Sequence, residues 1–531
     1  MATVGQQLTL PEVGWQRIDD TSSFLKYTGN WIVENASAHY NSTQHYSPNN
    51  AIGGAKISFK FKGTKLRLGS YNSPAYRISD VKVTIDGVVD TVSAAVGSEG
   101  PKVIFYERLG LSNSLHTVEV WNGAATTSIL SYGLDWLDID SDGYMRAIPE
   151  TPGSLKSSVT GMQIGDYIAC KYTATSGVVG SFSDFGGMPT AEIPTGGTAT
   201  PDGYFYFVKA ARGVLIADRI VQTGISYDLL NASGLLEGSS YLIATPIMTS
   251  NTTPSGEASA SVVTQGMAAN VFNRTLGGWT DRWFVDTFNS RPQRSVWVQY
   301  KFPTARVITA LELYCVVGDN GTGPSRAPGG FTLSGSNDGI DFTEIGTWSD
   351  IAGYVEYVPK LFEFTNNTAY LYYRFTVLST VSSSEMEIGE LYLLSPVVPR
   401  IPKGKVKSPY GGGAQTDNFG NPTLLYFPNK GWPASNEFDS YISNFSSVQE
   451  GKTTDDVFHS NALWTYCRNT IISGNWQRKD GVMTGAIGSN FYVARSTSVT
   501  ANPQWGTIAP ISSAVAATDG GFRPVLEYEE G

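Results

Sequence analysis

Residues 296–303, which are Val-Trp-Val-Gln-Tyr-Lys-Phe-Pro, give the clearest indication of the fold. Apolar side chains alternate along this run, as in a β-strand whose successive side chains point to opposite faces of a sheet. We therefore expect Val298 and Tyr300 on one face and Trp297 and Gln299 on the other. Because tryptophan is large and mostly apolar, we also interpret Trp297 and the earlier Trp283 as core residues.

Alternation of this kind recurs along the chain. Residues 57–61 read Ile-Ser-Phe-Lys-Phe, and residues 81–85 run into Asp86-Gly87, a dipeptide typical of a tight hairpin turn. The composition agrees, because 57 glycines and 12% aromatic residues suit sheets joined by tight turns. The sequence therefore predicts a mainly β, multi-domain fold of tandem β-sandwich or jelly-roll modules. One short helical turn is expected after Ser226, whose hydroxyl can cap it.

The chain is long enough for several domains. A length of 531 residues predicts three or four hydrophobic cores. Proline-containing stretches at residues 147–153, 249–256 and 395–402 suit linkers, because proline fixes φ and removes a hydrogen-bond donor. They divide the chain into a leader or attachment segment at 1–20, a first module at 21–146, a second block at 154–244, a third block at 245–398 and a last block at 403–531.

The third block carries a series of ordered motifs. They lie at residues 268–273, 281–283, 296–303, 307–314, 331–339, 373–375 and 388–393. In this order they resemble the discoidin or coagulation-factor type C domain, which is close to family-32 carbohydrate-binding modules. The resemblance implies a β-sandwich whose loops bind sugars or lipid head groups by aromatic stacking and polar contacts. The candidate ligand-binding residues are Trp279, Arg282, Phe284, Arg291 and Arg326.

The same resemblance implies a structural calcium ion near the start and end of the module. The matching positions are Asn273 and Glu390. Hard cations need several oxygen ligands, mostly carboxylates and carbonyls. Asn273 stands where the family usually has Asp, which removes one negative ligand. The sequence therefore establishes no cofactor, and a structural calcium ion is the one candidate.

The first module resembles a galactose-binding-like jelly roll. The resemblance lies in residues 62–68, 83–87, 111–118 and 133–139. Residues 138–143 read Asp-Ile-Asp-Ser-Asp-Gly, which matches the start of a calcium-binding loop. Such a loop needs Glu at its twelfth position, where this chain has Pro149. We therefore interpret the run as a solvated acidic strand end.

The second and last blocks resemble segments of phage and prophage structural proteins. The matching residues are 162–173, 201–207, 215–219, 431–439, 464–467, 494–498 and 521–528. The C-terminal residues 521–528 are similar to the last strand of sulfatase-modifying and C-type-lectin-like folds. This resemblance implies one mixed α+β lectin-like domain, residues 154–244 plus 403–531, into which the third block is inserted. The tip of such a domain could bind a ligand, with the candidates Trp464, Trp476, Arg478 and Tyr492.

Charge and hydropathy exclude several partners. Lys plus Arg number 37 and Asp plus Glu number 47, for a net charge of −10 without a basic cluster. This balance argues against nucleic acid and polybasic membrane attachment, and it leaves a neutral, hydroxyl-rich ligand compatible. No apolar run approaches the roughly 20 residues of a membrane span. Residues 1–7 lack a basic region followed by an apolar run, so we expect neither membrane insertion nor a signal peptide.

Catalytic motifs do not stand out. None of the four histidines belongs to an HExxH motif, and neither a GxSxG elbow nor a P-loop occurs. Cys170, Cys315 and Cys467 are too widely spaced for a CxxC zinc motif, so we expect small buried core residues. We expect no enzyme, although a glycosidase carboxylate pair stays open.

These resemblances indicate a virion structural protein of a tailed phage, in a tail fibre, baseplate or appendage. It would be synthesised in the host cytoplasm, lie beside other virion proteins, and adhere to host cell-surface glycans. The resemblance also implies a homo-oligomer, in which multivalency would make individually weak sites useful. Two alternatives stay open. One is a glycan-degrading enzyme with carbohydrate-binding modules, and the other is a purely architectural or capsid-decorating virion protein.

Overall fold

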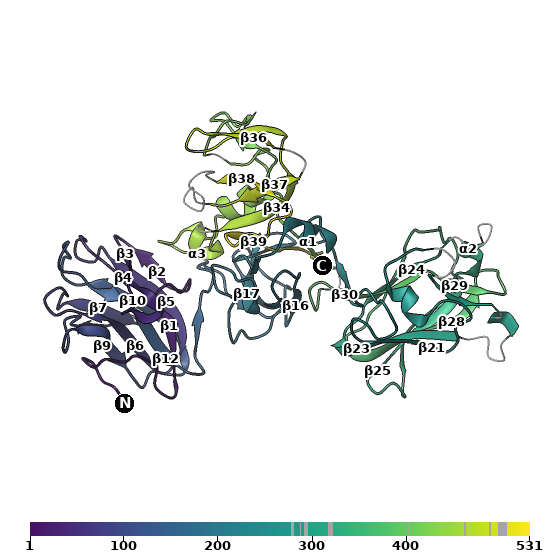
Figure 1. Ribbon diagram of the computed structural model, residues 1–531, viewed down its shortest axis with the longest axis horizontal. Coiled ribbons are helices and arrows are strands. Elements are labelled where there is room, and N and C mark those ends of the chain that lie inside the picture. Colours follow the sequence, from purple (N-terminus) through teal and green to yellow (C-terminus); the bar gives the residue numbers. More distant parts are fainter. Residues whose placement is uncertain are drawn as a thin grey trace. The chain divides into compact units, whose positions relative to one another are not determined.

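The computed structural model describes residues 1–277, 281–286, 288–290, 296–316, 322–401, 403–428, 430–460, 463–487, 490–497 and 507–530. Across these residues the chain is mainly β with a few short helices, which confirms the predicted fold class of β-sandwich modules. The chain forms two compact units, residues 1–237 with 407–530, and residues 238–406 (Figure 1). Within the described ranges, no helix is long and apolar enough to cross a membrane.

Residues 15–146 of the first unit form the N-terminal sandwich. Its first sheet holds, in order, β1 (Trp15–Asp19), β12 (Trp136–Asp140), β6 (Leu66–Asn72) and β9 (Gly100–Arg108). Its second sheet holds β13 (Tyr144–Arg146), β5 (Lys56–Gly63), β10 (Ser114–Asn122), β7 (Val81–Ile85) and β8 (Val88–Val92), with β2 (Lys26–Thr28) beside β5. A small third sheet holds β11 (Gly133–Leu134), β4 (Thr43–Tyr46) and β3 (Ile32–Asn35).

Local sequence signals explain these strands. In β5 the residues Ile57, Phe59 and Phe61 are buried while those between them are partly exposed, because side chains alternate between the two faces. Asp86 and Gly87 join β7 to β8 with φ of 51° and 84°. Two consecutive positive φ values match the twist of a tight hairpin, and glycine adopts them without a steric penalty. The hairpin prediction is confirmed.

Two expectations about the N-terminal sandwich are wrong. The segment 1–20 is not a separate leader, because β1 pairs along β12 with Arg17 opposite Asp138 and so completes the first sheet. The acidic run that starts at Asp138 is buried along its strand, and of its acidic residues only Asp142, beyond the strand, is exposed. Asp138 is buried against Arg17, and Asp140 accepts hydrogen bonds from the Thr64 hydroxyl and backbone N–H. These carboxylates already have partners within the sandwich.

The rest of the first unit is the framework. One of its sheets holds β14 (Leu155–Lys156), β15 (Tyr167–Thr173), β17 (Asp202–Ala211), β18 (Val214–Ala217), β40 (Val525–Glu527) and β31 (Lys405–Lys407), with β16 (Ser181–Ser183) beside β15. The other holds β19 (Gln222–Thr223), β39 (Gly520–Phe522), β34 (Trp464–Thr470), β37 (Phe491–Arg495) and β38 (Ile508–Ser512). The pairs β18–β40 and β19–β39 are antiparallel. Segments from both sides of the second unit therefore share the same sheets.

Short elements complete the framework. They are α1 (Tyr227–Ala232), the π-helix η5 (Asp439–Ser443), α3 (Thr454–Phe458) and the two-stranded pairs β32 (Gln415–Thr416) with β33 (Pro422–Thr423), and β35 (Gly474–Gln477) with β36 (Met483–Ile487). Ser226 caps α1 by accepting a hydrogen bond from the Leu229 N–H, which confirms the predicted helical turn. Cys170, Cys315 and Cys467 are free and buried, as predicted.

The predicted binding surface at the lectin-like tip is wrong for its aromatic residues. Trp464, Trp476 and Tyr492 are at most 1% exposed, since they pack inside the framework core. Arg478 is partly exposed and forms an ion pair with Asp480 at 2.8 Å. A ligand could reach none of the three rings without opening that core.

The second unit is the inserted sandwich. One sheet holds β21 (Glu257–Ala260), β23 (Val296–Arg306), β28 (Tyr370–Thr380), β25 (Pro328–Ser336) and β26 (Thr343–Trp348). The other holds β20 (Tyr241–Ile243), β30 (Glu390–Pro396), β24 (Ala310–Tyr314) and β27 (Lys360–Glu363). Apolar side chains from both sheets form one core. Trp283 lies in that core as predicted, whereas Trp297 lies on the opposite face from Val298 and is only partly buried, so its prediction as a core residue is wrong.

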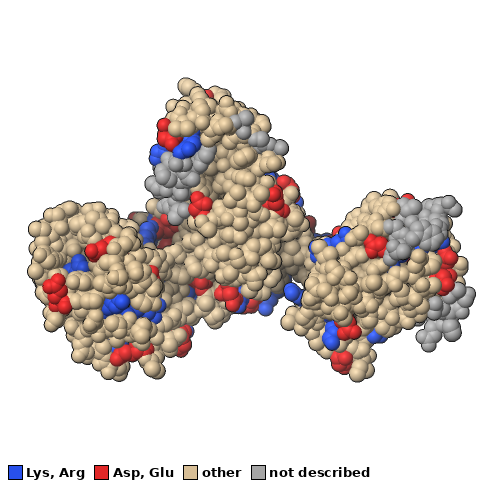
Figure 2. Space-filling view, viewed as in Figure 1, with Lys and Arg blue, Asp and Glu red and all other residues tan. Residues whose placement is uncertain are grey.

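Charged side chains are dispersed on the visible face of the molecule. Figure 2 shows Lys and Arg interspersed with Asp and Glu, and most of this face is neither basic nor acidic. On this face, such a surface is compatible with a neutral ligand.

Candidate functional site

Three of the candidate ligand-binding residues meet at β22 (Trp283–Val285) of the inserted sandwich. This strand pairs antiparallel with β29 (Met386–Ile388), which places Phe284 opposite Glu387. Because Trp283 and Val285 enter the core, the side chain between them points away from it. Trp279 and Arg291, two further candidates, lie outside the described residues.

Arg282 and Arg326 share the carboxylate of Glu387. Arg282 forms an ion pair with Glu387, and its Nη2 donates to Gln265 Oε1 at 3.1 Å. Arg326, at the end of the short helix α2 (Gly323–Arg326), lies 3.5 Å from Glu387 and also pairs with Glu385. Two guanidinium groups and two carboxylates thus neutralise one another at one end of the sandwich.

The ring of Phe284 lies against both guanidinium groups. Its centroid is 4.5 Å from the Arg282 guanidinium carbon and 5.6 Å from that of Arg326. Cation–π contacts of this kind contribute about 0.5–2 kcal/mol each. The ring therefore holds both cations in place, and we name Arg282, Phe284, Arg326, Glu385 and Glu387 the arginine cluster.

Burial divides the roles within the arginine cluster. Arg282 is 1% exposed, so it acts on the cluster by positioning Glu387. The side chain of Arg326 keeps 11% of its surface exposed, and Phe284 keeps 9%. Glu385 and Glu387 were not among the sequence candidates. Their spacing of two residues, just before the motif at 388–393, was the available signal that they share a face.

The predicted metal positions lie close together in the same sandwich. Glu390 is fully buried, its Oε1 accepts the Thr275 N–H at 2.8 Å, and its Oε2 has no hydrogen-bond partner among the described residues. Burial raises the pKa of Glu390 to about 8; the Thr275 N–H opposes this rise, and the nearby Asp281 adds to it. Asn273 donates its amide N–H to Asp281, and its own oxygen accepts the Thr275 N–H. The unsatisfied carboxylate oxygen suits a cation, and Asp281, not Asn273, is its acidic neighbour.

The described residues contain no group of three or more His, Cys, Asp or Glu side chains arranged to hold a metal ion. A calcium ion at Glu390 and Asp281 would therefore need backbone carbonyls or water as its further oxygen ligands.

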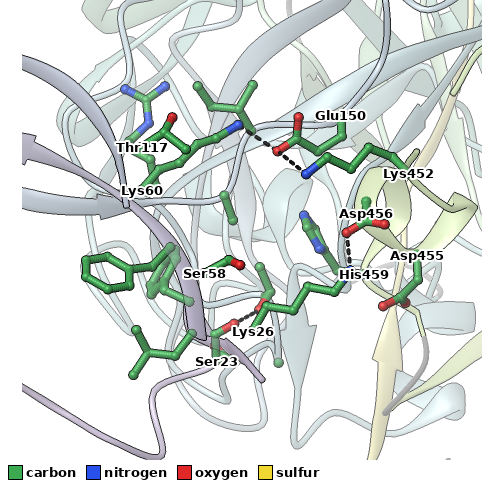
Figure 3. Close-up of a pocket in the computed structure, with 18 of the residues that line it drawn as sticks. Ser23, Lys26, Ser58, Lys60, Thr117, Glu150, Lys452, Asp455, Asp456 and His459 are labelled. Carbon is green, nitrogen blue, oxygen red and sulfur yellow. Dashed lines mark hydrogen bonds and ion pairs between the residues drawn. The ribbon is translucent and has the colours of Figure 1, made fainter. Parts of the chain in front are cut away.

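A cleft of about 340 Å³ lies within the first unit, between the N-terminal sandwich and the framework (Figure 3). Lys26 from β2 forms an ion pair with Asp456 from α3, and Lys60 from β5 donates to Glu150 at 2.6 Å. Lys452 lies 3.8 Å from the same Glu150 carboxylate. These ion pairs connect the two parts across the cleft.

Asp456, which lines this cleft, is not the protonated acid that glycoside hydrolysis requires. Such a reaction needs one carboxylic acid with a raised pKa. Burial acts to raise the pKa of Asp456, but the hydrogen bonds from Lys26 and Thr453 outweigh it, and the pKa is lowered. His459 lines the same cleft, and burial together with Arg219 and Arg523 lowers its pKa to about 3. Asp456 is therefore ionised and His459 neutral at pH 7.

No family model matches the chain. A curated protein similar to it is an A type blood alpha-D-galactosamine galactosaminidase from Flavonifractor plautii, which is 27% identical over 110 residues. Those residues are 21% of this chain and 10% of that protein, so the chain spans about a tenth of the length of the curated relative it matches.

Solved structures similar to the chain are family-32 carbohydrate-binding modules. A module from Clostridium perfringens in complex with GalNAc-beta-1,3-galactose is 16% identical, and the match covers 26% of this chain and 94% of that one with a TM-score of 0.21. A second module from C. perfringens, in complex with galactose, is 17% identical, with coverage of 26% and 93% and a TM-score of 0.21. A module from Streptococcus pneumoniae is 12% identical, with coverage of 28% and 99% and a TM-score of 0.23.

Proposed function

We propose that the chain is a glycan-binding protein that holds a neutral saccharide at the arginine cluster of the inserted sandwich. The observation that carries the proposal is the convergence of Arg282, Phe284 and Arg326 around Glu387. In this proposal Arg326 and Phe284 contact the sugar, while Arg282 positions Glu387.

The chemistry of the cluster favours a neutral, hydroxyl-rich ligand. Charged side chains that are already paired keep spare donors and acceptors for hydroxyl groups but attract no net charge. An aromatic ring can pack against the apolar face of a sugar while polar groups set its orientation. The name of the curated relative specifies alpha-D-galactosamine, so we choose its N-acetylated form and the parent sugar galactose as the first probes.

The test is calorimetric titration of the full chain with galactose- and N-acetylgalactosamine-terminated oligosaccharides. We expect binding by the unaltered chain and an at least tenfold weaker affinity for Arg326→Ala, which corresponds to about 1.4 kcal/mol. The matched control is Arg306→Ala, an exposed arginine of β23 in the same sandwich, which should bind normally. Equal binding by both variants, or no binding by the folded chain, would contradict the proposal.

The same incubation separates adhesion from catalysis. Retention of the oligosaccharide without any released product is the result expected of a binding protein. Release of shorter sugars, detected by chromatography, would favour the glycan-degrading enzyme. We expect no release, since the acid at Asp456 is held ionised by Lys26.

We include a structural calcium ion at Glu390 and Asp281 in the proposal. The unsatisfied Glu390 oxygen and the adjacent Asp281 carboxylate support it. Adding millimolar CaCl2 to the chelator-treated chain should raise the unfolding temperature of the inserted sandwich, measured by scanning calorimetry. Glu390→Gln should abolish this rise. Absence of any calcium effect on the unaltered chain would remove calcium from the proposal.

The virion role stays a prediction that rests on the resemblance of the framework segments to phage structural proteins. In that role, several copies of the chain would bind host glycans together, which strengthens weak individual sites. Light scattering of the purified chain tests the homo-oligomer that this role requires. A purely architectural protein would instead show no glycan retention at all.

A further inference from the structure

The outer face of one sheet in the inserted sandwich presents a row of aligned polar and aromatic side chains. In β23, β28 and β25, every second residue enters the core, including Val298, Phe375 and Leu333. The residues between them lie on the opposite face, because successive side chains alternate. Arg374, in the central strand of this trio, is directly opposite Gln299 on one side and Ser334 on the other.

Two aromatic rings hold the guanidinium group of Arg374. Its central carbon lies 4.3 Å from the ring centroid of Trp297 and 3.7 Å from that of Phe342. Its Nε donates to Gln299 Oε1 at 2.9 Å. A guanidinium group stacked on a ring keeps the N–H groups along its edge directed outward in its plane. The stack therefore orients Arg374 without using its terminal donors.

Arg374 has no acidic partner among the described residues. No ion pair includes it, and its Nη1 and Nη2 donate no hydrogen bond within the described chain. The side chain of Arg374 is partly buried, and this burial lowers its pKa. Arg282 and Arg326 in the same sandwich are both paired with carboxylates. The guanidinium group of Arg374 is oriented, partly desolvated and unpaired, so its free N–H donors are available to bind an anion.

The surroundings of Arg374 limit the class of anion. Lys301 lies on the same face, 5.4 Å from the ring of Tyr372, and forms no ion pair within the described residues. Glu344, opposite Ser334 on the next strand, and Glu257, opposite Lys301, are the exposed carboxylates nearest in the register. Two cations without an acidic partner, with the Ser334 hydroxyl beside Arg374, suit a ligand that carries both carboxylates and hydroxyl groups.

We propose that this sheet face is a second glycan site, distinct from the arginine cluster, which takes a carboxylate-bearing saccharide. The carboxylate of the saccharide accepts hydrogen bonds from two N–H groups at the edge of Arg374. Lys301 lies beside a neighbouring sugar unit. A guanidinium fork matches a carboxylate in a bidentate arrangement, which a lysine cannot reproduce. The inserted sandwich would then bind neutral sugars at one surface and acidic sugars at another.

The test is calorimetric titration of the full chain with a galacturonate oligomer, and with a neutral galactose oligomer of the same length. We expect Arg374→Gln to weaken galacturonate binding at least tenfold and to leave the neutral oligomer unaffected. Arg374→Lys should restore only part of the affinity. Arg306→Gln, on an exposed arginine of the same sheet, is the matched control and should bind both oligomers normally.

A second variant keeps every side chain of the stack. Ser334→Glu places a carboxylate directly opposite Arg374, so it should occupy the free donors and block galacturonate binding. The affinity of the unaltered chain for galacturonate should also fall as salt is added, because the contact is ionic and partly exposed.

Several outcomes would overturn the inference. One is that the folded chain does not bind galacturonate, and another is that Arg374→Gln and Ser334→Glu both bind it normally. Loss of galacturonate binding in Arg326→Ala alone would place the acidic sugar at the arginine cluster. Equal binding of a polyglutamate peptide would show that the face recognises carboxylates without a sugar. Failure of the neutral oligomer alone would contradict the proposed function and leave this inference intact.

Discussion

The N-terminal sandwich and the inserted sandwich both stack an arginine on a tryptophan, with different results. In the N-terminal sandwich the Arg17 guanidinium lies 3.5 Å from the ring centroid of Trp136 and donates to both oxygens of Asp138, at 2.7 and 2.9 Å. Both charged side chains are at most 1% exposed. In the inserted sandwich Arg374 lies on Trp297, partly exposed, and has no carboxylate partner in the described residues.

This difference separates a structural arginine from one available to a ligand. A buried charge must be paired, because an isolated ion loses its hydration without compensation. Arg17 could not lie where it does without Asp138, and the direct register of β1 with β12 provides that partner. Arg374 can stay unpaired because water reaches it. A stacked arginine with water access and no partner is therefore the feature that indicates a ligand site.

The largest expected effect comes from Arg17→Met. This change leaves the Asp138 carboxylate buried and unpaired, so the free energy of unfolding of the N-terminal sandwich should fall by about 3–5 kcal/mol. Scanning calorimetry of the full chain should show the loss as a lower transition temperature. The double variant Arg17→Met with Asp138→Leu should recover much of it. A loss below about 1 kcal/mol in the single variant would mean that the pair is not structural.

A second prediction concerns Asp135, a buried carboxyl near the paired Asp138. Burial raises the pKa of Asp135 to about 7, although the Tyr40 N–H donates to its Oδ1 at 2.7 Å. The folded pKa exceeds the unfolded one, so this stabilisation is complete below about pH 4 and is lost as the pH rises through about 7. The N-terminal sandwich should thus become less stable as the pH rises from about 4 to about 7, with little further change above that.

Asp135→Asn should remove this pH dependence, because an amide has no proton to lose. At pH 8 it should raise the free energy of unfolding by roughly 1–4 kcal/mol, measured by urea denaturation at several pH values. An unchanged pH profile in the variant would show that Asp135 titrates normally in the folded chain.

The smallest expected effect is that of Arg374→Met on stability. The side chain is partly exposed and contributes cation–π contacts but no ion pair, so the loss should stay below about 1 kcal/mol. Urea denaturation of the full chain measures it beside Arg17→Met. A loss as large as that of Arg17→Met would make Arg374 a structural residue and weaken its assignment to a ligand.

Local signals in the sequence predict the local structure well. The alternation in residues 57–61 and 296–303, the turn at Asp86-Gly87 and the cap at Ser226 all appear as expected. Each of these depends on residues that are neighbours in the chain, so propensity and pattern suffice. The resemblance of the third block also identified a region of the chain that forms one compact sandwich.

Burial of individual polar and aromatic residues could not be predicted in the same way. From the sequence, Arg282 is expected at the surface as a cation. In the structure it is buried in an ion pair with Glu387, which lies more than 100 residues away in the chain. Trp464 and Trp476 look available to a ligand until the framework sheets cover them. Trp297 looks like a core residue until the register of β23 assigns it to the outer face.

The sequence by itself determined the β class of this protein and its short turns and caps. It also determined the negative net charge, which argues against nucleic-acid binding. These properties follow from composition and from interactions within a few residues. Only the tertiary structure decided which arginines are neutralised and which stay available. That outcome depends on strand register between distant segments, because a charge can be buried only where another part of the chain delivers its partner.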